Sequence, residues 1–340
     1  MSHAVSPTML WESTSAHEAL RQRFQFASAE ETAHWLMQIV SSVYDVPVEA
    51  VDRLVISSSN LLAWLTTADG PLIAKCCALV SAHDRLSNVA ELLVWLDQEH
   101  LPVSVPLRTK VGQRQVTCDH LSLSVQRVIP GSLLDPTQLV QARTAGMTLA
   151  QLHTALVAYP RATDFATQFP IPPLDEIIND WVEKNTTMLA DPSLVAGSKA
   201  VVQRLRTSLM PNLATQVVHN DYRAANILWQ SGNITAVLDF EELRWGYSVN
   251  DLAWAAVHLG TRFHQWGPVS AEVHAAFLAG YEALHPLTEP EWAWLPVLMT
   301  WHTMNLAISA TGPTYAACLD SIRTYTRLLE DKQTIAGTLL

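Results

Sequence analysis

Hydrophobic and polar positions change their spacing along the first 130 residues. Residues 1–16 show no regular pattern and are expected to form a loose terminus. Residues 33–43 place hydrophobic side chains three or four positions apart, which predicts a helix that ends before Pro47. Short apolar runs and polar turns then predict strands, and one helical pattern interrupts them. The strands are expected at residues 54–56, 61–65, 72–77, 114–118 and 121–128, the helix at 84–99, and a hinge at 129–131.

Beyond the hinge the helical spacing dominates. Helices are expected at residues 142–156, 174–189, 193–209, 249–260, 271–284, 290–310 and 315–329. Only residues 217–239 break this pattern, with short strand-like runs at 227–229 and 236–238. We therefore expect an α+β protein with an N-terminal extension that carries a helix (1–50), a small antiparallel β-sheet lobe (51–130) and a larger, mainly helical lobe (131–340).

Composition narrows the function classes. Hydrophobic residues make up 49% of the 340 residues and charged residues 16%, which is enough apolar material for a sizeable core. The net charge of −11 argues against a nucleic-acid partner, because such partners need basic surfaces. It mildly favours a cationic or neutral partner, although solubility alone explains an acidic balance.

The four cysteines are Cys76, Cys77, Cys118 and Cys318, and no CxxC pair occurs. This argues against a disulfide framework or a zinc site and fits a reducing cytoplasm. The chain does not open like a signal peptide, and no apolar stretch reaches the roughly 18 residues that span a bilayer. We expect a soluble, cytoplasmic protein without a membrane partner.

The most polar segment inside apolar surroundings runs from Val217 to Glu242. Within it, Asp221, Asn226 and Asp239 supply two carboxylates and one amide oxygen. Phosphoryl transfer to an alcohol needs a carboxylate that orients the hydroxyl, together with hard oxygen ligands for Mg²⁺. The segment therefore predicts a kinase site.

His219, Asp221 and Asn226, followed by residues 237–241, resemble the catalytic and metal-binding loops of the aminoglycoside phosphotransferase and choline kinase family. The resemblance extends over about residues 50–330. It includes a turn with Ser59 and Asn60, residues 73–75, Pro130 with Gly131, and residues 149–153. It implies a protein-kinase-like fold with a nucleotide-binding N-terminal lobe and a C-terminal lobe that carries the catalytic loop and the acceptor site.

The resemblance also implies roles for individual residues. Asp221 would orient the acceptor hydroxyl, and Arg223 would offset charge on the transferred phosphoryl group. Asn226 and Asp239 would hold Mg²⁺, and His219 would brace the loop. The nucleotide, ATP or GTP, would meet the side chains or backbone of Lys75, Ser59, Asn60, Gln126 and Val128.

Three features depart from the protein-kinase pattern. Residues 57–60 replace a GxGxxG loop, so that backbone and hydroxyl donors would meet the phosphates. Glu91 is the candidate partner for Lys75, but it lies opposite the apolar stripe of its predicted helix, which leaves the pair open. Phe240 and Glu241 follow Asp239 where a glycine-ending motif is usual, which argues against a mobile activation segment.

The acceptor has two alternatives: an aminoglycoside-like antibiotic, or a metabolite such as an amino alcohol or homoserine. Acidic side chains are candidates to grip an acceptor amine, namely Asp180, Glu183, Glu241 and Glu242. The tryptophans of the helical part are expected mainly in the core, with a few available to wall an acceptor pocket.

Two other classes of function compete with a kinase. One is a nucleotide-binding pseudokinase scaffold. The complete set of Lys75, Asp221, Asn226 and Asp239 weighs against it. The other is a metal-dependent hydrolase built on His219, Asp221 and His258.

Overall fold

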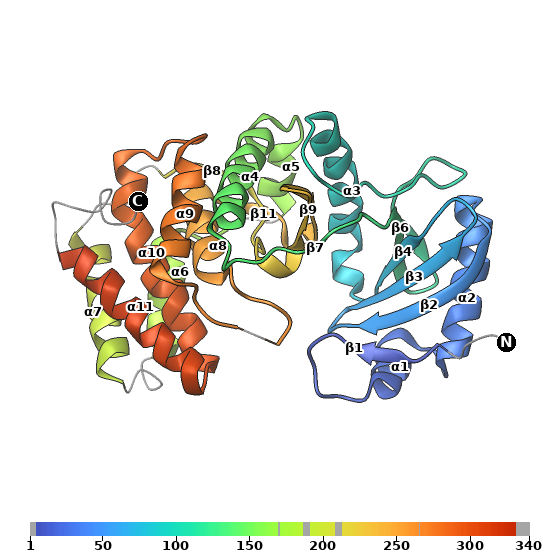
Figure 1. The fold of residues 1–340 in the computed structure, drawn as a ribbon, viewed down its shortest axis with the longest axis horizontal. Coiled ribbons are helices and arrows are strands. Elements are labelled where there is room, and N and C mark those ends of the chain that lie inside the picture. The colour runs from blue at the N-terminus through green and yellow to red at the C-terminus, as the bar shows by residue number, and fades with distance from the viewer. Residues whose placement is uncertain (1–4, 169–170, 186–190, 208–212, 265, 331–340) are drawn as a thin grey trace. The chain divides into compact units, whose positions relative to one another are not determined.

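The computed structural model describes residues 5–168, 171–185, 191–207, 213–264 and 266–330. The chain divides into two compact units, Met1–Pro130 and Gly131–Leu340 (Figure 1). The first unit is built around a β-sheet and the second is mostly helical, so the predicted α+β class is confirmed. Within the described residues, no helix is both long and apolar enough to cross a membrane.

The described part of the first unit contains a six-stranded sheet, in which the strands lie in the order β1-β2-β3-β4-β6-β5. Its strands are β1 (Pro7–Met9), β2 (Val48–Ile56), β3 (Asn60–Thr67), β4 (Leu72–Cys77), β5 (Val116–Cys118) and β6 (Leu121–Arg127). All neighbours are antiparallel except β1 and β2. The strands from 54 to 128 lie where the apolar runs predicted them.

The prediction of a loose terminus over residues 1–16 is wrong where the structure describes them, from residue 5 onward, and residues 1–4 lie outside the described residues. Pro7–Met9 pairs in parallel with β2, and α1 (Ala16–Phe24) follows and buries Leu20 and Phe24. A three-residue strand has no room to show a periodic pattern, so the sequence carries no local signal for it. Its stability comes from pairing with an existing sheet edge.

The other helices of the first unit agree with the sequence pattern. The predicted helix at 33–43 lies within α2 (Ala29–Tyr44), which Ser28 caps by accepting from Glu31 N–H. Side chains of α1, α2 and the sheet share one hydrophobic core, as the packing of α2 beside β2 shows (Figure 1). After a short 3₁₀ turn, η1 (Val80–Ala82), comes α3 (His83–Gln98), which is the helix predicted at 84–99.

Eight helices lie in the described part of the second unit. They are α4 (Leu139–Ala158), α5 (Ala162–Gln168), α6 (Leu174–Asn185), α7 (Pro192–Thr207), α8 (Ser248–His258), α9 (Ala271–Glu282), α10 (Glu289–Ser309) and α11 (Gly312–Glu330). Seven correspond to predicted helices, although the predicted ends at 186–189 and 208–209 lie outside the described residues. The seven-residue α5 was not predicted, because it is too short to give a clear helical period.

Two small sheets interrupt these helices. One contains β10 (Asn233–Val237), β9 (Ile227–Gln230) and β7 (Ser132–Leu133), and the other pairs β11 (Arg244–Tyr247) with β8 (Thr215–Val218). The strands β9 and β10 match the predicted runs. The other three have four residues or fewer and were missed.

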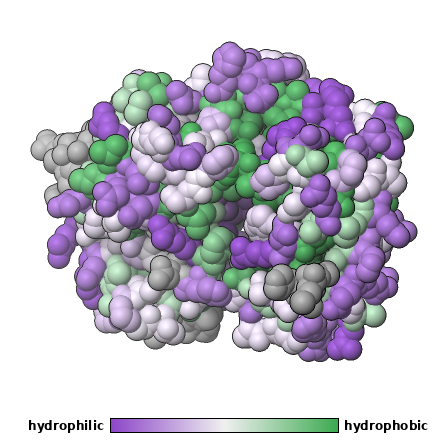
Figure 2. Space-filling view, turned by 45° about the vertical axis from the view of Figure 1, so that its right-hand side comes forward, coloured by the Kyte–Doolittle hydropathy of each residue, from purple (hydrophilic) through white to green (hydrophobic). Residues whose placement is uncertain are grey.

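Most of the large apolar side chains lie inside the units. Trp294, Tyr222 and Phe277 are each no more than 1% exposed. On the face drawn in Figure 2, hydrophilic residues are spread widely and hydrophobic ones form smaller groups between them. Trp294 and Trp301 are buried in the core as expected, whereas Trp254 and Trp292 are half-buried and Trp266 is 45% exposed.

His274 on α9 gives the second unit a pH-dependent stability. It is buried, its Nδ1 is hydrogen-bonded to the Tyr325 hydroxyl at 3.0 Å, and burial lowers its pKa from 6.5 to about 4. Between these values the unfolded chain binds a proton that the folded chain does not bind. The free energy of unfolding should therefore be constant above pH 6.5 and fall as the pH drops towards 4, by about 3 kcal/mol for this residue.

Urea unfolding of the wild type and of His274→Asn between pH 7 and pH 4.5 measures this contribution. Asn keeps a polar atom near the Tyr325 hydroxyl but does not titrate, so its stability should fall less steeply with pH. Equal slopes for the two proteins would contradict the assignment.

Candidate active site

The polar segment of the second unit is held by strand pairing. Strand β8 leads into His219 and pairs with β11, and Val217 and Val218 bury their side chains. The segment then turns through Asn220, which has a φ of 62°, and continues into η3 (Ala224–Asn226) and β9. Strand β10 returns to Asp239, which also has a φ of 62° and precedes η4 (Phe240–Glu242). The Leu238 N–H donates to Asn226 O at 2.8 Å and ties the two ends together.

Asp221 is the best-supported catalytic candidate. Its Oδ1 accepts from Arg223 Nε at 2.9 Å and its Oδ2 accepts from Asn226 Nδ2 at 2.7 Å. Burial raises the pKa of the carboxyl to about 6 and the negative charge of Asp239 raises it too, while Arg223 and the hydrogen bonds act in the opposite direction. The result is a carboxylate fixed in position and more basic than an ordinary aspartate.

A buried carboxylate on α8 braces this loop. Asp251 Oδ1 accepts from Asn220 N–H at 2.7 Å, and Oδ2 accepts from His219 N–H at 3.2 Å. His153 Nε2 on α4 lies 2.9 Å from the same Oδ2. Although burial acts to raise the pKa of Asp251, the His153 contact and the loop N–H bonds hold it below its usual value. The catalytic loop is thereby anchored to α4 and α8.

His219 is a structural member of this network. Its ring is fully buried, Nε2 lies 3.1 Å from Leu238 O, and Nδ1 accepts from Asp221 N–H at 3.2 Å. Burial lowers its pKa. A neutral ring that donates to Leu238 and accepts from Asp221 satisfies both nitrogens, so His219 is suited to bracing rather than to proton transfer.

Asn226 and Asp239 form a donor set that suits Mg²⁺. Asn226 Nδ2 donates to both the carbonyl and the carboxylate of Asp221, which turns its Oδ1 away from Asp221 as a potential ligand. The Asp239 carboxylate lies close enough to raise the pKa of Asp221 and of His219. Hard oxygens from one amide and one carboxylate, completed by phosphate and water, fit the ligand preference of magnesium.

Arg223 has an unusual environment. Its side chain is 7% exposed, and its buried Nη1 has no hydrogen-bond partner among the residues that the structure describes. The guanidinium carbon also lies 5.3 Å from the centre of the Trp266 ring. A buried donor without a partner costs about 1–3 kcal/mol, so this nitrogen is available to a ligand oxygen beside Asp221.

The predicted nucleotide residues lie in the first unit. Ser59 and Asn60 belong to the β2–β3 turn, where Ser57 N–H donates to Asn60 O at 2.8 Å and Ala78 N–H to Ser59 O at 2.9 Å. Lys75 is half-buried on β4, opposite Ser124 of β6. Glu91 is exposed on α3, as the helical wheel indicated, and its charge acts on Arg114.

The structure of residues 126–128, just before the predicted hinge, limits which backbone groups could contact a purine. Gln126 lies opposite Ile73 in the sheet, and Val128 N–H already donates to Pro71 O at 3.1 Å. That donor is engaged, so the hinge would have to receive a purine mainly through carbonyl oxygens and other N–H groups.

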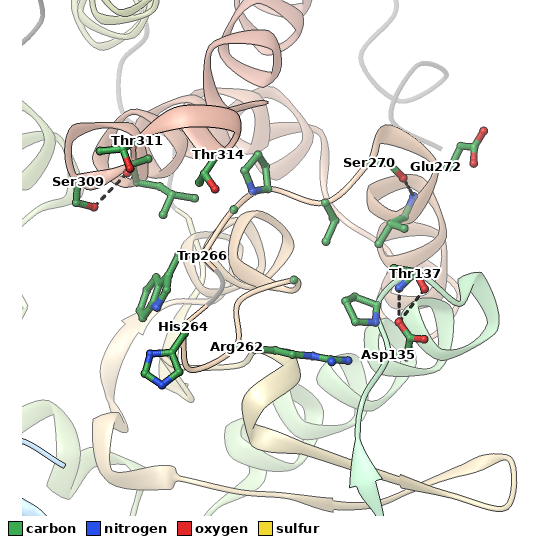
Figure 3. Close-up of a pocket in the computed structure, with 18 of the residues that line it drawn as sticks. Asp135, Thr137, Arg262, His264, Trp266, Ser270, Glu272, Ser309, Thr311 and Thr314 are labelled. Carbon is green, nitrogen blue, oxygen red and sulfur yellow. Dashed lines mark hydrogen bonds between the residues drawn. The ribbon is translucent and has the colours of Figure 1, made fainter. Parts of the chain in front are cut away.

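Sequence reasoning did not identify three residues around these sites. Arg23 of α1 donates from Nη1 to Ser57 O at 2.9 Å and pairs with Glu12 at 2.6 Å, which braces the β2–β3 turn. Asp135 and Arg262 line a cavity of about 1190 Å³ in the second unit, next to Trp266 (Figure 3). None belongs to a local motif, and they meet their neighbours only through the tertiary fold.

A metal-dependent hydrolase would need a metal site, and none is seen in the part of the chain that the structure describes. No group of three or more His, Cys, Asp or Glu side chains there could hold a metal ion. His258 Nδ1 contacts Trp254 O at 3.0 Å and its ring stacks on Trp254, so this histidine is held within its own helix.

Comparisons with known proteins agree with the site. The sequence is similar to a homoserine kinase of Phenylobacterium zucineum, 26% identical over 213 residues. This match covers 61% of the chain and spans only 62% of the length of that kinase. A viomycin phosphotransferase of Streptomyces vinaceus is 28% identical over 184 residues, which cover 51% of this chain and 62% of that enzyme.

A solved structure gives the same fold. The aminoglycoside phosphotransferase of Alicyclobacillus acidocaldarius superposes with a TM-score of 0.62 over 93% of this chain and 99% of that one, at 14% identity. The expected protein-kinase-like fold is thereby confirmed. The profile of the phosphotransferase enzyme family matches residues 53–295, which include every predicted site residue. The chain therefore belongs to the phosphotransferase enzyme family.

Proposed function

We propose that the chain transfers the γ-phosphate of ATP or GTP to the hydroxyl of a small amino-acid-type metabolite, of the kind that homoserine represents. The observation that carries this proposal is the buried Asp221 carboxylate, which Arg223 and Asn226 hold by hydrogen bonds at 2.9 Å and 2.7 Å. The similarity to homoserine kinase supports a metabolite as acceptor rather than an aminoglycoside.

Asp221 would accept a hydrogen bond from the acceptor hydroxyl and take its proton as the oxygen attacks the γ-phosphorus in line. Its raised pKa suits this role, because a base works best when its pKa lies near the working pH. Arg223 Nη1, which is buried without a partner, would stabilise charge that develops on the phosphoryl oxygens.

Asn226 and Asp239 would hold Mg²⁺ through their side-chain oxygens. When bound, the ion would neutralise negative charge on the nucleotide phosphates. The Asn226 amide has a second task, because its Nδ2 orients Asp221. Asn226→Asp would abolish that hydrogen bond and place two carboxylates side by side.

Lys75 would contact the α- and β-phosphates, and Ser59 with Asn60 would meet the phosphates in place of a glycine-rich loop. The purine would lie against residues 126–128. A Lys75–Glu91 pair remains open, with Glu91 exposed on α3.

Arg23→Ala should raise the KM for ATP about three- to tenfold and leave kcat within about twofold. Arg23 donates a charged hydrogen bond to Ser57 O, and its loss would loosen the turn that carries Ser59 and Asn60. Steady-state kinetics against ATP check this, with Arg21→Ala as the control, since Arg21 is exposed on the same helix. An unchanged KM in Arg23→Ala would mean that the turn does not bind nucleotide.

A larger, antibiotic-like acceptor is the second candidate. The cavity of about 1190 Å³ beside Trp266 exceeds the usual range of about 300–1,000 Å³ for small-molecule pockets, and a free amino acid would fill only a part of it. The similarity to viomycin phosphotransferase points the same way.

An acceptor screen separates these possibilities. Release of ADP or GDP is measured with Mg²⁺ present for homoserine, amino alcohols, viomycin, aminoglycosides and macrolides. Turnover of homoserine or an amino alcohol at the highest kcat/KM supports the proposal, and a preference for an antibiotic supports the second candidate. Tight nucleotide binding without turnover of any acceptor would favour the scaffold alternative.

A further inference from the structure

A cavity of about 1190 Å³ in the second unit lies between several of its helices and loops. Its walls come from the start of α4, the loop after α8, and the connection between α10 and α11 (Figure 3). Neighbours of two lining residues are hydrogen-bonded to the polar segment. Ala224 N–H donates to O of Leu259, the residue before Gly260, at 3.0 Å, and N–H of Leu134, the residue before Asp135, donates to Ile227 O at 2.9 Å. The cavity therefore lies beside elements that are bonded to the segment carrying Asp221.

Arg223 connects this cavity to the proposed base. Its Nε donates to Asp221, and its guanidinium packs on Trp266, a cavity residue. The buried Nη1 without a partner lies on the same group. An acceptor that packs against Trp266 would thus lie next to the guanidinium that touches Asp221.

Three charged side chains line the cavity, those of Arg262, Asp135 and Glu272. Arg262 extends towards Asp135, and Glu272 points away from both (Figure 3). Arg262 donates from one Nη to Leu134 O at 2.7 Å, the hydrogen bond found for it among the described residues, and it retains donors on its other nitrogens. Asp135 Oδ1 accepts from Thr137 N–H at 3.0 Å and from Thr137 Oγ1 at 2.8 Å, which holds the carboxylate in place.

We infer that Arg262 and Asp135 form the subsite for the non-reacting end of the acceptor, and that this end is a zwitterion with a carboxylate and an ammonium group on one carbon. Arg262 binds the carboxylate and Asp135 the ammonium group. The inference rests on the proposed function and names the substrate class as an α-amino acid with a side-chain hydroxyl. A polycationic acceptor fits less well, because it would bring positive charge against Arg262 and Arg223.

The test compares two acceptors that differ only in the carboxylate, homoserine and 3-amino-1-propanol. Arg262→Gln should raise the KM for homoserine about ten- to a hundredfold and change the KM for 3-amino-1-propanol less than threefold. Asp135→Asn should raise the KM for both, since both carry the ammonium group. Arg161→Gln is the matched control, because Arg161 pairs with Asp164 on the surface of the same unit and should leave both values unchanged.

Calorimetry can measure the binding of homoserine to the ADP-loaded protein without any phosphate transfer. This measurement therefore tests the subsite independently of the proposed function. Homoserine that binds the wild type but not Arg262→Gln supports the subsite even if no phosphate is transferred, and in that case only the proposed function fails. Equal losses for both acceptors in Arg262→Gln, unchanged values for both, or no binding of homoserine to the wild type would overturn the inference.

Discussion

Replacing Asp221 by Asn is expected to lower kcat by about a thousandfold while the Kd for ATP changes less than threefold. The substitution keeps the size of the side chain and one acceptor oxygen, but it removes the base that receives the hydroxyl proton. It also ends the ion pair with Arg223, in which Nε and Oδ1 lie 2.9 Å apart. Steady-state kinetics, together with calorimetric titration of ATP, check both halves of this prediction.

Asp164→Asn is the control for this variant. Asp164 is an exposed carboxylate of the same unit that pairs with Arg161, and its loss should leave kcat unchanged. A kcat for Asp221→Asn within threefold of the wild type would show that another group orients the acceptor.

Gly280→Ala is expected to destabilise the second unit by about 3–5 kcal/mol. Helices α4 and α9 pack so closely that a Cβ at Gly280 would overlap the backbone carbonyl of Arg143, and one at Gly146 would overlap that of Phe277. Backbone atoms cannot rotate away as side chains do, so the helices would have to separate. Gly146→Ala should behave in the same way.

Thermal unfolding measures this effect. A loss of 3–5 kcal/mol corresponds to a decrease in Tm of about 10 °C for a unit of this size. Ala279→Gly is the control at the neighbouring half-buried position. It removes a methyl group instead of adding one and should lower the free energy of unfolding by only about 1 kcal/mol, through the lower helix propensity of glycine. If Gly280→Ala melted at the temperature of the wild type, the close approach of α4 and α9 would be refuted.

Local hydrophobic patterns in the sequence are enough to predict some of the helices and strands but not others. Several long helices and strands follow from hydrophobic spacing. Strand β3 buries every second side chain, and α2 buries one side chain in every three to four. Strand β1 could not be predicted, because three residues carry no period and their order comes from pairing with β2. The same holds for β7, β8 and β11, which are stable only through their partners.

In the candidate site, too, residues that lie close in sequence could be predicted, whereas residues brought together by the fold could not. Asp221, Asn226 and Asp239 lie close in sequence, so their spacing alone predicted a shared site, and the structure ties Asn226 to Asp221 by a hydrogen bond. The cavity residues Asp135 and Arg262 lie far apart in the chain and meet only after α4 and the loop beyond α8 have packed. The acidic residues proposed to grip an acceptor illustrate the limit, because Asp180 pairs with Lys184 and Glu242 with Arg244. In the subsite inferred above, Asp135 would bind the acceptor amine instead of them.

The central claim is that this phosphotransferase acts on the hydroxyl of an amino-acid-type acceptor, and phosphorus NMR of the reaction product tests it most directly. The protein is incubated with ATP, Mg²⁺ and homoserine, and the spectrum is followed with time beside Asp221→Asn. The proposed function predicts a new phosphomonoester signal that grows in step with ADP and is absent in the variant. ATP that stays intact, or that yields only ADP and inorganic phosphate, would contradict it.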